Sequence, residues 1–454
     1  MTPQQALRVI FVGLGTSVVP LDTAVNIAFP DITQSFGLPI ESIQWVVICY
    51  VLTYASLMLA FGRVGDIFGH GRVFRVGLLW SGTAYLLCAA APGYGWLLFC
   101  RFLQGIGASL VVSCAPAIVT GLFPEDKRTR AVALFTMIYA IGSALGPLLG
   151  GVLVHVWGWP AVFWFRAPIA FASLVFPAAF AAPVSRGTRE PLDILGAILL
   201  ALGISTLLLA LNQLQHPGRH ALLPAAFLTT AAASLFGFVY WERLVAQPIV
   251  NLDFFRNARF AAANLASVLI YVASFSVLLF GPYYLVRVEG LSLFAAGAAL
   301  AASFVGSIVG SPLAGAIIAR LSAGRVAALG ALLSGTGLVL IGSSGAGAAW
   351  WILAVLGALA LQGLGVGLFQ VAYMDIVMQT LPRRHRGVSG SVAMLSRSLG
   401  VVIGATLFTL VFHVIEQYFP GDAFMPGFRA TFWLAGVMSA IAGLLLAVTA
   451  KARR

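Results

Sequence analysis

The sequence contains very little charge. Of its 454 residues, 9% are Asp, Glu, Lys or Arg, whereas 60% are hydrophobic, and the mean hydropathy is +0.99. A soluble protein of this size covers its surface with far more charge. Apolar runs of about twenty residues recur from end to end, and each is long enough to cross about 30 Å of hydrocarbon. The composition excludes a soluble globular protein and indicates an all-α integral membrane protein.

Cysteine is scarce, and phosphate-binding motifs are missing. The four cysteines are Cys49, Cys88, Cys100 and Cys114. They lie inside apolar runs at no spacing typical of metal ligands, so we expect neither disulfides nor a zinc site. The chain also lacks a Gly-rich loop of the Walker type, which argues against direct ATP hydrolysis. We predict no cofactor and no bound metal.

The formal net charge is nevertheless +12, which raises the question of nucleic-acid binding. In nucleic-acid-binding proteins the basic residues gather on one face, whereas here they stand singly or in small groups between apolar runs. Most of them fall in alternate loops and at the termini, which is the positive-inside pattern. We therefore expect no nucleic-acid partner, a multi-pass protein of the bacterial inner (plasma) membrane, and both termini in the cytoplasm.

The apolar runs predict fourteen transmembrane helices. They lie at roughly 7–29, 42–62, 74–92, 95–121, 131–155, 160–181, 192–212, 222–245, 260–286, 292–319, 326–345, 349–378, 388–414 and 429–450. We predict an N-terminal six-helix bundle in 1–181, two inserted helices with a cytoplasmic linker in 182–259, and a C-terminal six-helix bundle in 260–454. No loop is long enough to hold a soluble domain.

Two distant stretches share one pattern of Gln, Gly, Pro and Arg. The first contains Gln104, Gly105, Gly107, Pro124, Arg128, Gly142 and Gly146, and the second repeats it without a gap as Gln362, Gly363, Gly365, Pro382, Arg386, Gly400 and Gly404. A repeat at this distance is typical of transporters whose two halves are built alike. The second copy lacks the Arg of Arg101, so the halves share a scaffold but differ in chemistry.

Four motifs in chain order resemble signatures of the major facilitator superfamily. They are Leu21-Asp22-Thr23 with Asn26-Ile27-Ala28-Phe29-Pro30; Gly62-Arg63-Val64-Gly65-Asp66 with Phe68-Gly69 and Arg72; Arg101 with Gln104-Gly105-Ile106-Gly107; and Gly142-Ser143-Ala144-Leu145-Gly146-Pro147 with Gly150-Gly151. The first is similar to the first-helix signature of the fourteen-helix drug:proton antiporter family, and the last resembles a fifth-helix motif of proton-coupled exporters. The resemblance implies a major facilitator fold of two six-helix bundles plus two additional helices.

The sequence departs from this family at several positions. The family usually has one more residue between the first-helix Asp and Asn, and basic residues where this chain has Ile67, His70 and Gly71. It usually has Asn where this chain has Arg166. The loop motif survives in the second half only as Gly324-Arg325-Val326. These departures concern the substrate and the gating, not the fold.

Four charged residues lie deep inside predicted spans: Asp22, Arg101, Arg166 and Arg397. Each costs about 2.5–3.5 kcal/mol on insertion scales unless it has a partner or a wet cavity. At about 1.5 Å per residue, Asp22, Arg101 and Arg166 all reach roughly 9–12 Å below the outer surface. We therefore expect one layer that holds an acid between two guanidinium groups.

Two interpretations of this layer remain open. Either Asp22 exchanges protons while Arg101 or Arg166 compensates its charge, or the three residues form a permanent structural ion pair. We predict the first, with proton coupling at Asp22 and Arg101. The predicted substrate cavity contains Asn26, Gln104, Arg166 and Arg397. Arg397 either faces that cavity or pairs with a backbone carbonyl at a helix break.

Aromatic residues are available to line the rest of the cavity, although packing or interfacial anchoring explains most of them equally simply. They are Trp45, Tyr50, Tyr139, Phe163, Trp164, Tyr271, Tyr283 and Tyr284. An aromatic cavity suits lipophilic substrates.

The loop after the second span is predicted to act in gating. Its residues are Gly62, Asp66, Gly69 and Arg72. The Asp66 carboxylate is placed to accept hydrogen bonds at the N-terminus of the next helix and to balance Arg72. It is either a latch that opens during transport or a salt bridge that only stabilises the loop.

The glycines of the fifth-helix motif predict a tight helix seam. Gly142, Gly146 and Gly150 recur every four residues and so share one helix face, which permits close backbone approach. Pro147 removes a hydrogen-bond donor there and favours a bend, and Gly151 extends the small-residue patch. We predict that this seam seals the pathway against leak; ordinary glycine-mediated packing is the alternative.

Together these features predict a proton-coupled secondary active transporter. We expect a monomer that exports amphiphilic drugs or small toxic metabolites by alternating access, with protons and a small-molecule substrate as its partners in the lipid bilayer. The alternative within transport is a proton symporter that imports a small organic solute, including an anionic one. A lipid-modifying membrane enzyme would need a nucleophile–base cluster. His155, His216, His220 and His413 have none nearby in sequence, so we predict no enzyme.

Overall fold

A computed structural model of the chain describes residues 3–121, 125–175, 193–213, 222–245, 248, 252–344, 351–380, 388–418 and 424–451. Its regular elements within these ranges are all helical, and none of them is a strand. The chain divides into two compact units, Met1–Ala201 with Val245–Ile249 and Leu202–Leu244 with Val250–Arg454. The predicted all-α fold class is confirmed.

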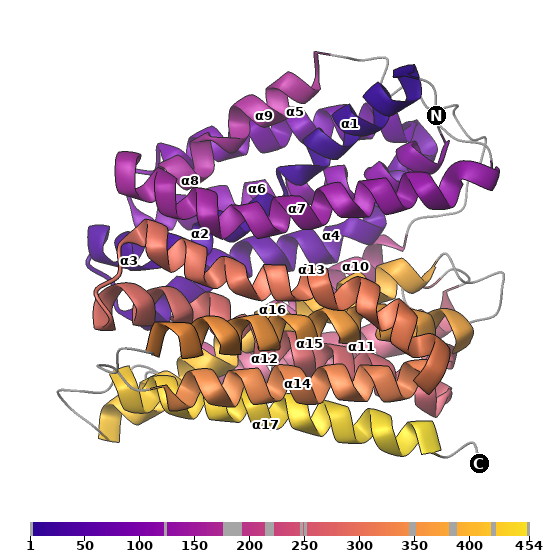
Figure 1. Cartoon of the computed structure of the whole chain (residues 1–454). Coiled ribbons are helices and arrows are strands. Elements are labelled where there is room, and N and C mark those ends of the chain that lie inside the picture. The colour runs from indigo at the N-terminus through magenta and orange to yellow at the C-terminus, as the bar shows by residue number, and fades with distance from the viewer. Residues whose placement is uncertain are drawn as a thin grey trace. The chain divides into compact units, whose positions relative to one another are not determined.

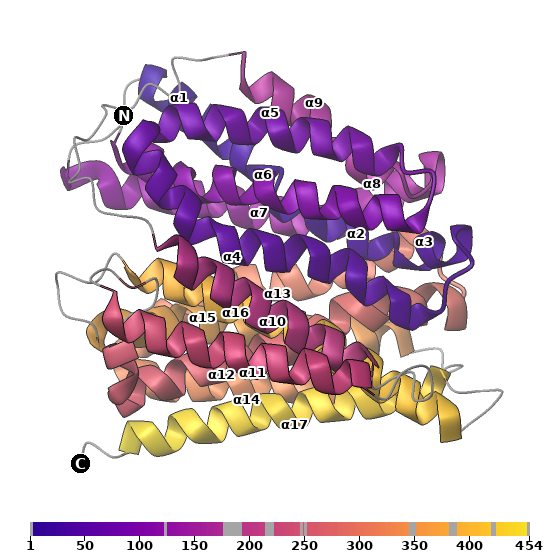
Figure 2. The same cartoon turned by 180° about the vertical axis from the view of Figure 1, so that it is seen from behind.

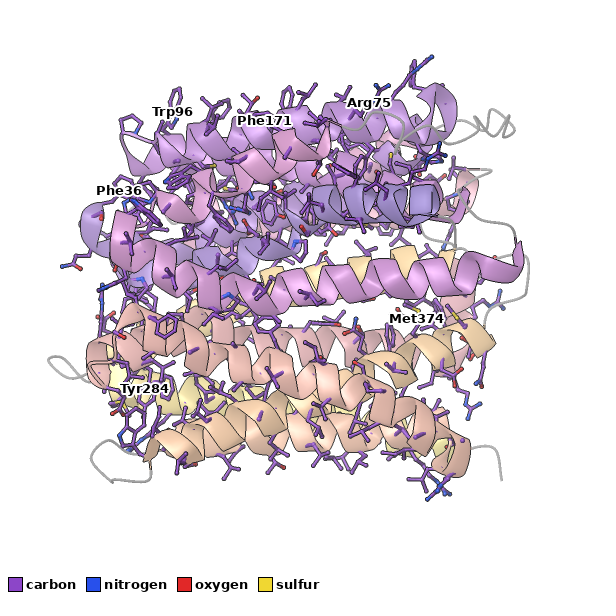
Figure 3. All side chains as sticks on the ribbon, turned by 45° about the horizontal axis from the view of Figure 1, so that its top comes forward. Phe36, Arg75, Trp96, Phe171, Tyr284 and Met374 are labelled. Carbon is purple, nitrogen blue, oxygen red and sulfur yellow. The ribbon has the colours of Figure 1, made fainter. Side chains whose placement is uncertain are left out.

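Ten helices within the described ranges are long and apolar enough to cross a membrane. Three shorter apolar helices are Ile141–Trp157, Ala161–Ser173 and Ile194–Leu207. The predicted total of fourteen spans, and the domain boundaries at 181 and 259, stay predictions. The large side chain of Trp96 points outward from the N-terminal bundle (Figure 3) and is 47% exposed. Phe171 is 36% exposed, with its ring against Gly82. Such a surface fits contact with lipid rather than with water.

The N-terminal unit is a bundle of helices that run alongside one another (Figure 1). Its long members are α4 (Gln44–Phe68), α5 (His70–Ala89), α6 (Tyr94–Gly121) and α7 (Glu125–Trp157). Helix α6 packs against both α4 and α5, and also touches α1 and α7. This central position buries Arg101 and Gln104 in the interior of the unit, whereas Trp96 of the same helix stays exposed.

The first span is interrupted, whereas the sequence predicts one continuous span over 7–29. It consists of α1 (Pro3–Ser17), the 3-10 helix η1 (Pro20–Thr23), α2 (Ala24–Ile27) and α3 (Phe29–Ser35). Pro20 has no N–H to donate to the Thr16 carbonyl, so the α-helical ladder stops there. The N–H of Val19 bonds to that carbonyl instead at 3.1 Å. The break puts Asp22 in a short 3-10 turn inside the bundle.

The sixth span is also interrupted. It begins with α8 (Ala161–Trp164), and α9 (Arg166–Ser173) follows after a single residue. Pro168 cannot donate to the Trp164 carbonyl, which explains the interruption. Arg166 is the first residue of α9 and therefore stands at the interruption. The predicted end of this span near 181 lies outside the described residues.

The C-terminal unit is a second bundle. Its long helices are α12 (Ala258–Tyr283), α13 (Leu293–Leu321), α14 (Ala323–Ser343), α15 (Trp351–Thr380), α16 (Val388–Tyr418) and α17 (Phe424–Lys451). A π-helical turn, η5 (Tyr284–Val288), extends α12, and the 3-10 helix η4 (Leu252–Arg256) precedes it. Helix α15 packs against α13 and α14, and α12 packs against α16 and α17.

The two inserted helices of the prediction are α10 (Ile194–Gln213) and α11 (Leu222–Leu244). They lie side by side (Figure 2), and Leu235 of α11 packs directly over Gly203 of α10. Long apolar side chains of α11, such as Phe236 and Leu222, are exposed by 74% and 83%. This pair therefore adds apolar surface rather than core.

The repeated glycines pack alike in the two units. A Cβ added at Gly105 of α6 would meet Thr53 and the Tyr50 carbonyl of α4, and one at Gly363 of α15 would overlap the Ser303 carbonyl of α13. Gly107 lies against Ser81 of α5 in the same way as Gly365 lies against Ser334 of α14. The sequence repeat therefore corresponds to a repeated way of packing one central helix between two neighbours.

Candidate functional site

The carboxylate of Asp22 is the centre of a buried polar cluster in the N-terminal unit. Its Oδ1 accepts hydrogen bonds from Arg101 Nη1 at 2.7 Å, Gln104 Nε2 at 2.8 Å and Arg166 Nη1 at 2.6 Å. Its Oδ2 accepts one from Arg101 Nη2 at 2.9 Å. Arg101 thus binds the carboxylate through both terminal nitrogens, which is the strong geometry for this pair.

Backbone carbonyls fix the direction of both guanidinium groups. Arg101 Nε donates to the Val46 carbonyl of α4 at 2.8 Å, and Arg166 Nε donates to the Val162 carbonyl of α8 at 3.1 Å. Gln104 Oε1 accepts from Arg101 Nη1 at 2.9 Å. The cluster is therefore assembled from α4, α6, α8, α9 and the broken first span, and no single helix could form it.

The cluster holds two guanidinium groups against one carboxylate. The side chains of Arg101 and Arg166 are 2% and 0% exposed, whereas that of Asp22 is 14% exposed. Aromatic rings cover the surplus positive charge: Arg101 lies 4.3 Å from the centroid of Tyr50, and Arg166 lies 4.4 Å from that of Tyr85. Cation–π contacts in desolvated sites contribute about 2 kcal/mol each, so these rings help the unit to bury an uneven charge.

Asp22, Arg101 and Arg166 are the three residues predicted to share one depth, and in the structure both arginines bind the Asp22 carboxylate, as does Gln104 of the predicted cavity. Asn26 lies apart from the carboxylate: its Nδ2 donates to the Thr23 carbonyl at 3.1 Å. Arg397 belongs to the C-terminal unit, where its guanidinium lies 5.3 Å from the ring centroid of Tyr271. The two units are not placed relative to one another, so a shared cavity that includes Arg397 stays a prediction.

Among the predicted gating residues, Gly69 has a clear structural role. It joins α4 to α5 with φ of 93°, a left-handed conformation that favours glycine. Its N–H bonds to the Gly65 carbonyl at 2.9 Å, and its own carbonyl accepts from the Arg72 N–H at 3.0 Å. Gly62 is half-buried and the Arg72 side chain is exposed. The side chain of Asp66 lies outside the described part of the chain, so its role as a latch stays a prediction.

The predicted glycine seam faces the broken span. A Cβ at Gly142 would lie 3.1 Å from Pro20 Cγ, one at Gly146 would overlap Thr23 Oγ1, and one at Gly150 would lie 2.7 Å from the Ala24 carbonyl oxygen. Helix α7 continues through Pro147 to Trp157, and Pro147 and Gly151 are buried. The three glycines of the seam therefore contact the segment that carries Asp22.

Sequence reasoning missed Tyr85. Its ring lies under Arg166, and its hydroxyl donates to the Val18 carbonyl at 3.3 Å, at the end of α1 where the helix stops. Tyr50 and Phe163, by contrast, were among the expected cavity aromatics, and both lie near the guanidinium groups. The sequence offered one indication of this role: Tyr85 lies well inside the third predicted span, 74–92, at a depth where it could meet the charged layer.

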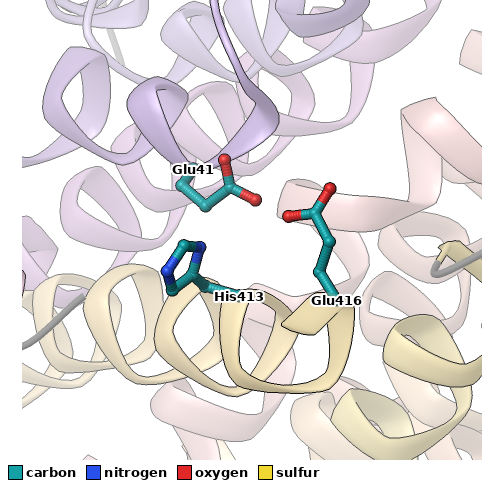
Figure 4. A group of neighbouring side chains, drawn as sticks. All are labelled: Glu41, His413 and Glu416. Carbon is teal, nitrogen blue, oxygen red and sulfur yellow. The ribbon is translucent and has the colours of Figure 1, made fainter. Parts of the chain in front are cut away.

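Three residues of types that bind metals, Glu41, His413 and Glu416, belong to different units. Glu41 belongs to the 3-10 helix η2 (Ile40–Ile43), which precedes α4, whereas His413 and Glu416 share a face of α16 (Figure 4). Because the relative position of the two units is not determined, these residues define no site.

Comparisons with known proteins agree with the architecture. A family model described as "Major Facilitator Superfamily" matches residues 9–405, and a second, overlapping match covers 263–454. The chain is 28% identical over 443 residues to a methylenomycin A resistance protein of Bacillus subtilis (strain 168), a match that covers 96% of this chain and 92% of that protein. It is 26% identical over 452 residues to the riboflavin transporter RibZ of Clostridioides difficile (strain 630), with 98% and 97% covered.

A solved structure shows the same fold. A bacterial homologue of the human lysosomal transporter Spinster, in an inward-facing and occupied conformation, has a TM-score of 0.72 at 17% identity, with 99% of this chain and 98% of that chain covered. The superfamily predicted from the four motifs is thereby confirmed, and the chain is a multi-pass membrane protein that transports small molecules rather than an enzyme. With most of its length matched by the family model, the chain belongs to the major facilitator superfamily.

Proposed function

We propose that the chain is a proton-coupled secondary transporter that exports small amphiphilic toxic compounds, drugs or metabolites, by alternating access. The observation that carries this proposal is Asp22, a partly exposed carboxylate in a helix break, bound by Arg101 and Arg166. An ionisable group inside a membrane span is costly to keep. Its placement at a break, where backbone can move, suits a group that exchanges a proton during transport.

The contacts of Asp22 support a link between its protonation and the conformation of the unit. A proton on Asp22 removes the negative charge that its carboxylate presents to Arg101 and Arg166, so it weakens both ion pairs. The Val46 carbonyl and the Tyr50 ring hold the Arg101 guanidinium in place when the carboxylate leaves. Protonation therefore favours a movement of the η1 segment away from Arg101, and deprotonation favours its return.

The direction of transport and the substrate class rest on relatives rather than on the site. The Bacillus subtilis relative is named as a methylenomycin A resistance protein, which supports export of a toxic compound. We further propose a bacterial inner-membrane protein that acts as a monomer with cytoplasmic termini. The substrate cavity would contain Asn26, Gln104, Arg166 and Arg397. The loop with Gly62, Asp66, Gly69 and Arg72 would act in gating.

A second candidate function is import of an anionic solute together with a proton. The observation that favours it is the surplus of one positive charge in the buried cluster. Neutralising Asp22 increases that surplus, so binding of a proton and binding of an anion reinforce each other, which leads to transport in the same direction. A relative that is named as a riboflavin transporter supports a metabolite as the solute.

The two candidates are separated in membrane vesicles with an imposed pH gradient. A panel of cationic, neutral and anionic amphiphilic dyes is offered to everted and to right-side-out vesicles. Export predicts accumulation in everted vesicles that are acidic inside, and anion import predicts accumulation in right-side-out vesicles that are acidic outside. Accumulation that ignores the pH gradient in both preparations contradicts both.

Asp22→Asn tests the proton site directly. We expect this variant to lose uphill transport completely while it is expressed and purified like the wild type, because Asn keeps the shape of the side chain but cannot exchange a proton. Asp375→Asn is the matched control, since the Asp375 carboxylate accepts an exposed hydrogen bond from Gln379 of its own helix at 2.8 Å. Normal uphill transport by Asp22→Asn would remove Asp22 from the mechanism.

A further inference from the structure

The seam glycines and the break that carries Asp22 form one contact. Pro20, the first residue of η1, lies opposite Gly142, and Thr23, its last residue, lies opposite Gly146. Ala24, which begins α2, lies opposite Gly150. Asp22 is therefore enclosed in a segment whose two ends both rest on the glycine face of α7.

The hydroxyl of Thr23 links this segment to α7. Thr23 Oγ1 lies 3.1 Å from the Ser143 carbonyl of α7 and 3.0 Å from the Pro20 carbonyl of its own turn, and it donates its single hydrogen to these two acceptors. A Cβ at Gly146 would overlap this oxygen, so no larger residue fits at 146 unless Thr23 moves. Glycine at 146 is explained by the space that the Thr23 hydroxyl occupies.

Local structure alone cannot hold Asp22 in position. A 3-10 turn of four residues has poorer hydrogen-bond geometry than an α-helix and is rarely stable without packing. Besides the hydrogen bonds to Asp22 itself, the Tyr85 hydroxyl donates to the Val18 carbonyl, 3.3 Å away on the side of α5. The direction of the Asp22 carboxylate therefore depends on hydrogen bonds and packing between the turn and the neighbouring helices.

We propose that Thr23 is a positioning residue for the proton site: its hydroxyl, seated on Gly146 and bonded to the Ser143 carbonyl, holds the η1 turn so that Asp22 faces Arg101 and Arg166. This inference rests on the proposed function, which assigns the exchanging proton to Asp22. It gives the glycine motif of α7 a specific task, namely that a shift of α7 moves Thr23 and thereby changes the contacts of the neighbouring carboxylate.

The charged and titratable groups around Asp22 define what such a shift changes. Helix α6 contributes Arg101 with Gln104, and α9 contributes Arg166. Tyr50 of α4 and Tyr85 of α5 face the two guanidinium groups. On the side of α7, the described contacts of the turn are glycines and a carbonyl. Loss of the Thr23 contact therefore alters the distance from Asp22 to the guanidinium groups without adding or removing a charge.

Thr23→Val and Thr23→Ser form the matched pair that tests this proposal. Valine keeps the volume but removes the hydroxyl, whereas serine keeps the hydroxyl. The protonated carboxyl band of Asp22 is followed by infrared difference spectroscopy against pH in proteoliposomes without substrate, and it is identified by its absence from Asp22→Asn. We expect Thr23→Val to move the titration midpoint upward by about one pH unit, equivalent to about 1.4 kcal/mol, and Thr23→Ser to titrate like the wild type.

Gly146→Ala and Gly404→Ala form a second pair for the same measurement. Alanine at 146 must displace Thr23, and alanine at 404 crowds the Val272 carbonyl of the C-terminal unit at 2.8 Å. We expect a shifted midpoint for Gly146→Ala and an unshifted one for Gly404→Ala. An unshifted midpoint in Thr23→Val, or equal shifts in Thr23→Val and Thr23→Ser, overturns the proposal. Wild-type vesicles without pH-driven transport would instead overturn the proposed function, because the titration uses neither substrate nor gradient.

Discussion

The two units use one packing scheme for different chemistry. Gln104 of α6 and Gln362 of α15 occupy equivalent places in the repeat, and the glycines beside them pack in the same way. Gln104 donates to the Asp22 carboxylate. Gln362 instead donates to Ser274 Oγ at 3.2 Å and accepts from Ser303 Oγ at 2.6 Å. The difference teaches that the central helix supplies a buried amide in both units, and that only its partners decide whether the layer is charged.

The first helix of each unit shows the same contrast. In the C-terminal unit, Gly400 and Gly404 of α16 pack on Val268 and Val272 of α12, which continues from Ala258 to Tyr283. In the N-terminal unit the corresponding glycines of α7 pack on a helix that is broken at Pro20. A glycine face therefore does not require a break, and the break is a specific feature of the unit that buries the acid.

The C-terminal unit has a buried polar cluster of its own, but it is neutral. Asn264 Oδ1 accepts from Tyr373 at 2.8 Å and from Ser396 at 3.1 Å, while Asn264 Nδ2 donates to the Phe260 carbonyl at 2.8 Å. Neutral groups with hydrogen-bond partners cost far less to bury than charges do. This arrangement fits a division in which proton exchange belongs to the N-terminal unit.

Arg101→Leu should have the largest effect on the difference between the charged N-terminal layer and the neutral C-terminal one. It gives the N-terminal unit the residue found at the equivalent place in the C-terminal unit, Leu359. The variant leaves Asp22 with Arg166 and loses two of its hydrogen bonds. A hydrogen bond to a charged group contributes about 1.5–3 kcal/mol, while Arg166 still balances the Asp22 charge, so we expect a loss of stability of that order in mixed-micelle unfolding and no uphill transport.

Two further variants separate charge from shape at this position. Arg101→Lys keeps the charge but loses the planar fork that binds both carboxylate oxygens, so we expect an intermediate loss. The double variant Arg101→Leu with Asp22→Asn completes a mutant cycle for the pair; it leaves Arg166 buried without a carboxylate, so we expect it to regain neither stability nor transport. A single Arg101→Leu variant as stable as the wild type would show that the pair is not coupled.

Gln104→Leu and Gln362→Leu compare the two central helices directly. A hydrogen bond to a charged group contributes about 1.5–3 kcal/mol, whereas neutral side-chain hydrogen bonds inside membrane proteins average about 0.6 kcal/mol. We expect Gln104→Leu to lower unfolding stability clearly and to impair proton coupling, and Gln362→Leu to change stability by less than half as much. Equal losses for the two variants would mean that the charge of the N-terminal layer adds nothing to the amide contact.

The charged layer was predictable because helix rise is fixed. Counting residues from the ends of three predicted spans placed Asp22, Arg101 and Arg166 at one depth. Because unpaired charges are costly inside a membrane, an acid and two bases at the same depth are expected to form ion pairs. The repeat was also readable, because close helix packing demands glycine at the same positions in both copies.

The local shape around Asp22 could not be read in the same way. A single 3-10 turn of four residues hardly changes the hydropathy of a whole span. The span over 7–29 was therefore predicted as continuous, although α1 stops before Pro20. The contacts of Thr23 with Gly146 and of Tyr85 with Val18 join residues distant in sequence. Such contacts depend on how α5 and α7 approach the broken helix, and no spacing rule within one span contains that information.

Tyr85→Phe and Tyr85→Leu test the finest feature that distinguishes the N-terminal unit, the support of its break from α5. Phenylalanine removes the hydrogen bond to the Val18 carbonyl, which is long at 3.3 Å, so we expect a loss of at most about 0.6 kcal/mol. Leucine also removes the ring from Arg166, and a desolvated cation–π contact adds about 2 kcal/mol to the loss. Thermal unfolding in detergent measures both.

The order of these two variants decides what Tyr85 does. If Tyr85→Leu is the more damaging and Asp22→Asn increases the difference between the variants, the ring balances the surplus charge that the Asp22 cluster leaves on Arg166. If the two variants lose the same stability, the hydroxyl alone matters, and Tyr85 acts on the broken helix rather than on the guanidinium group. The second result would leave the surplus charge of the N-terminal unit compensated by Tyr50 and Phe163 alone among the aromatic contacts described here.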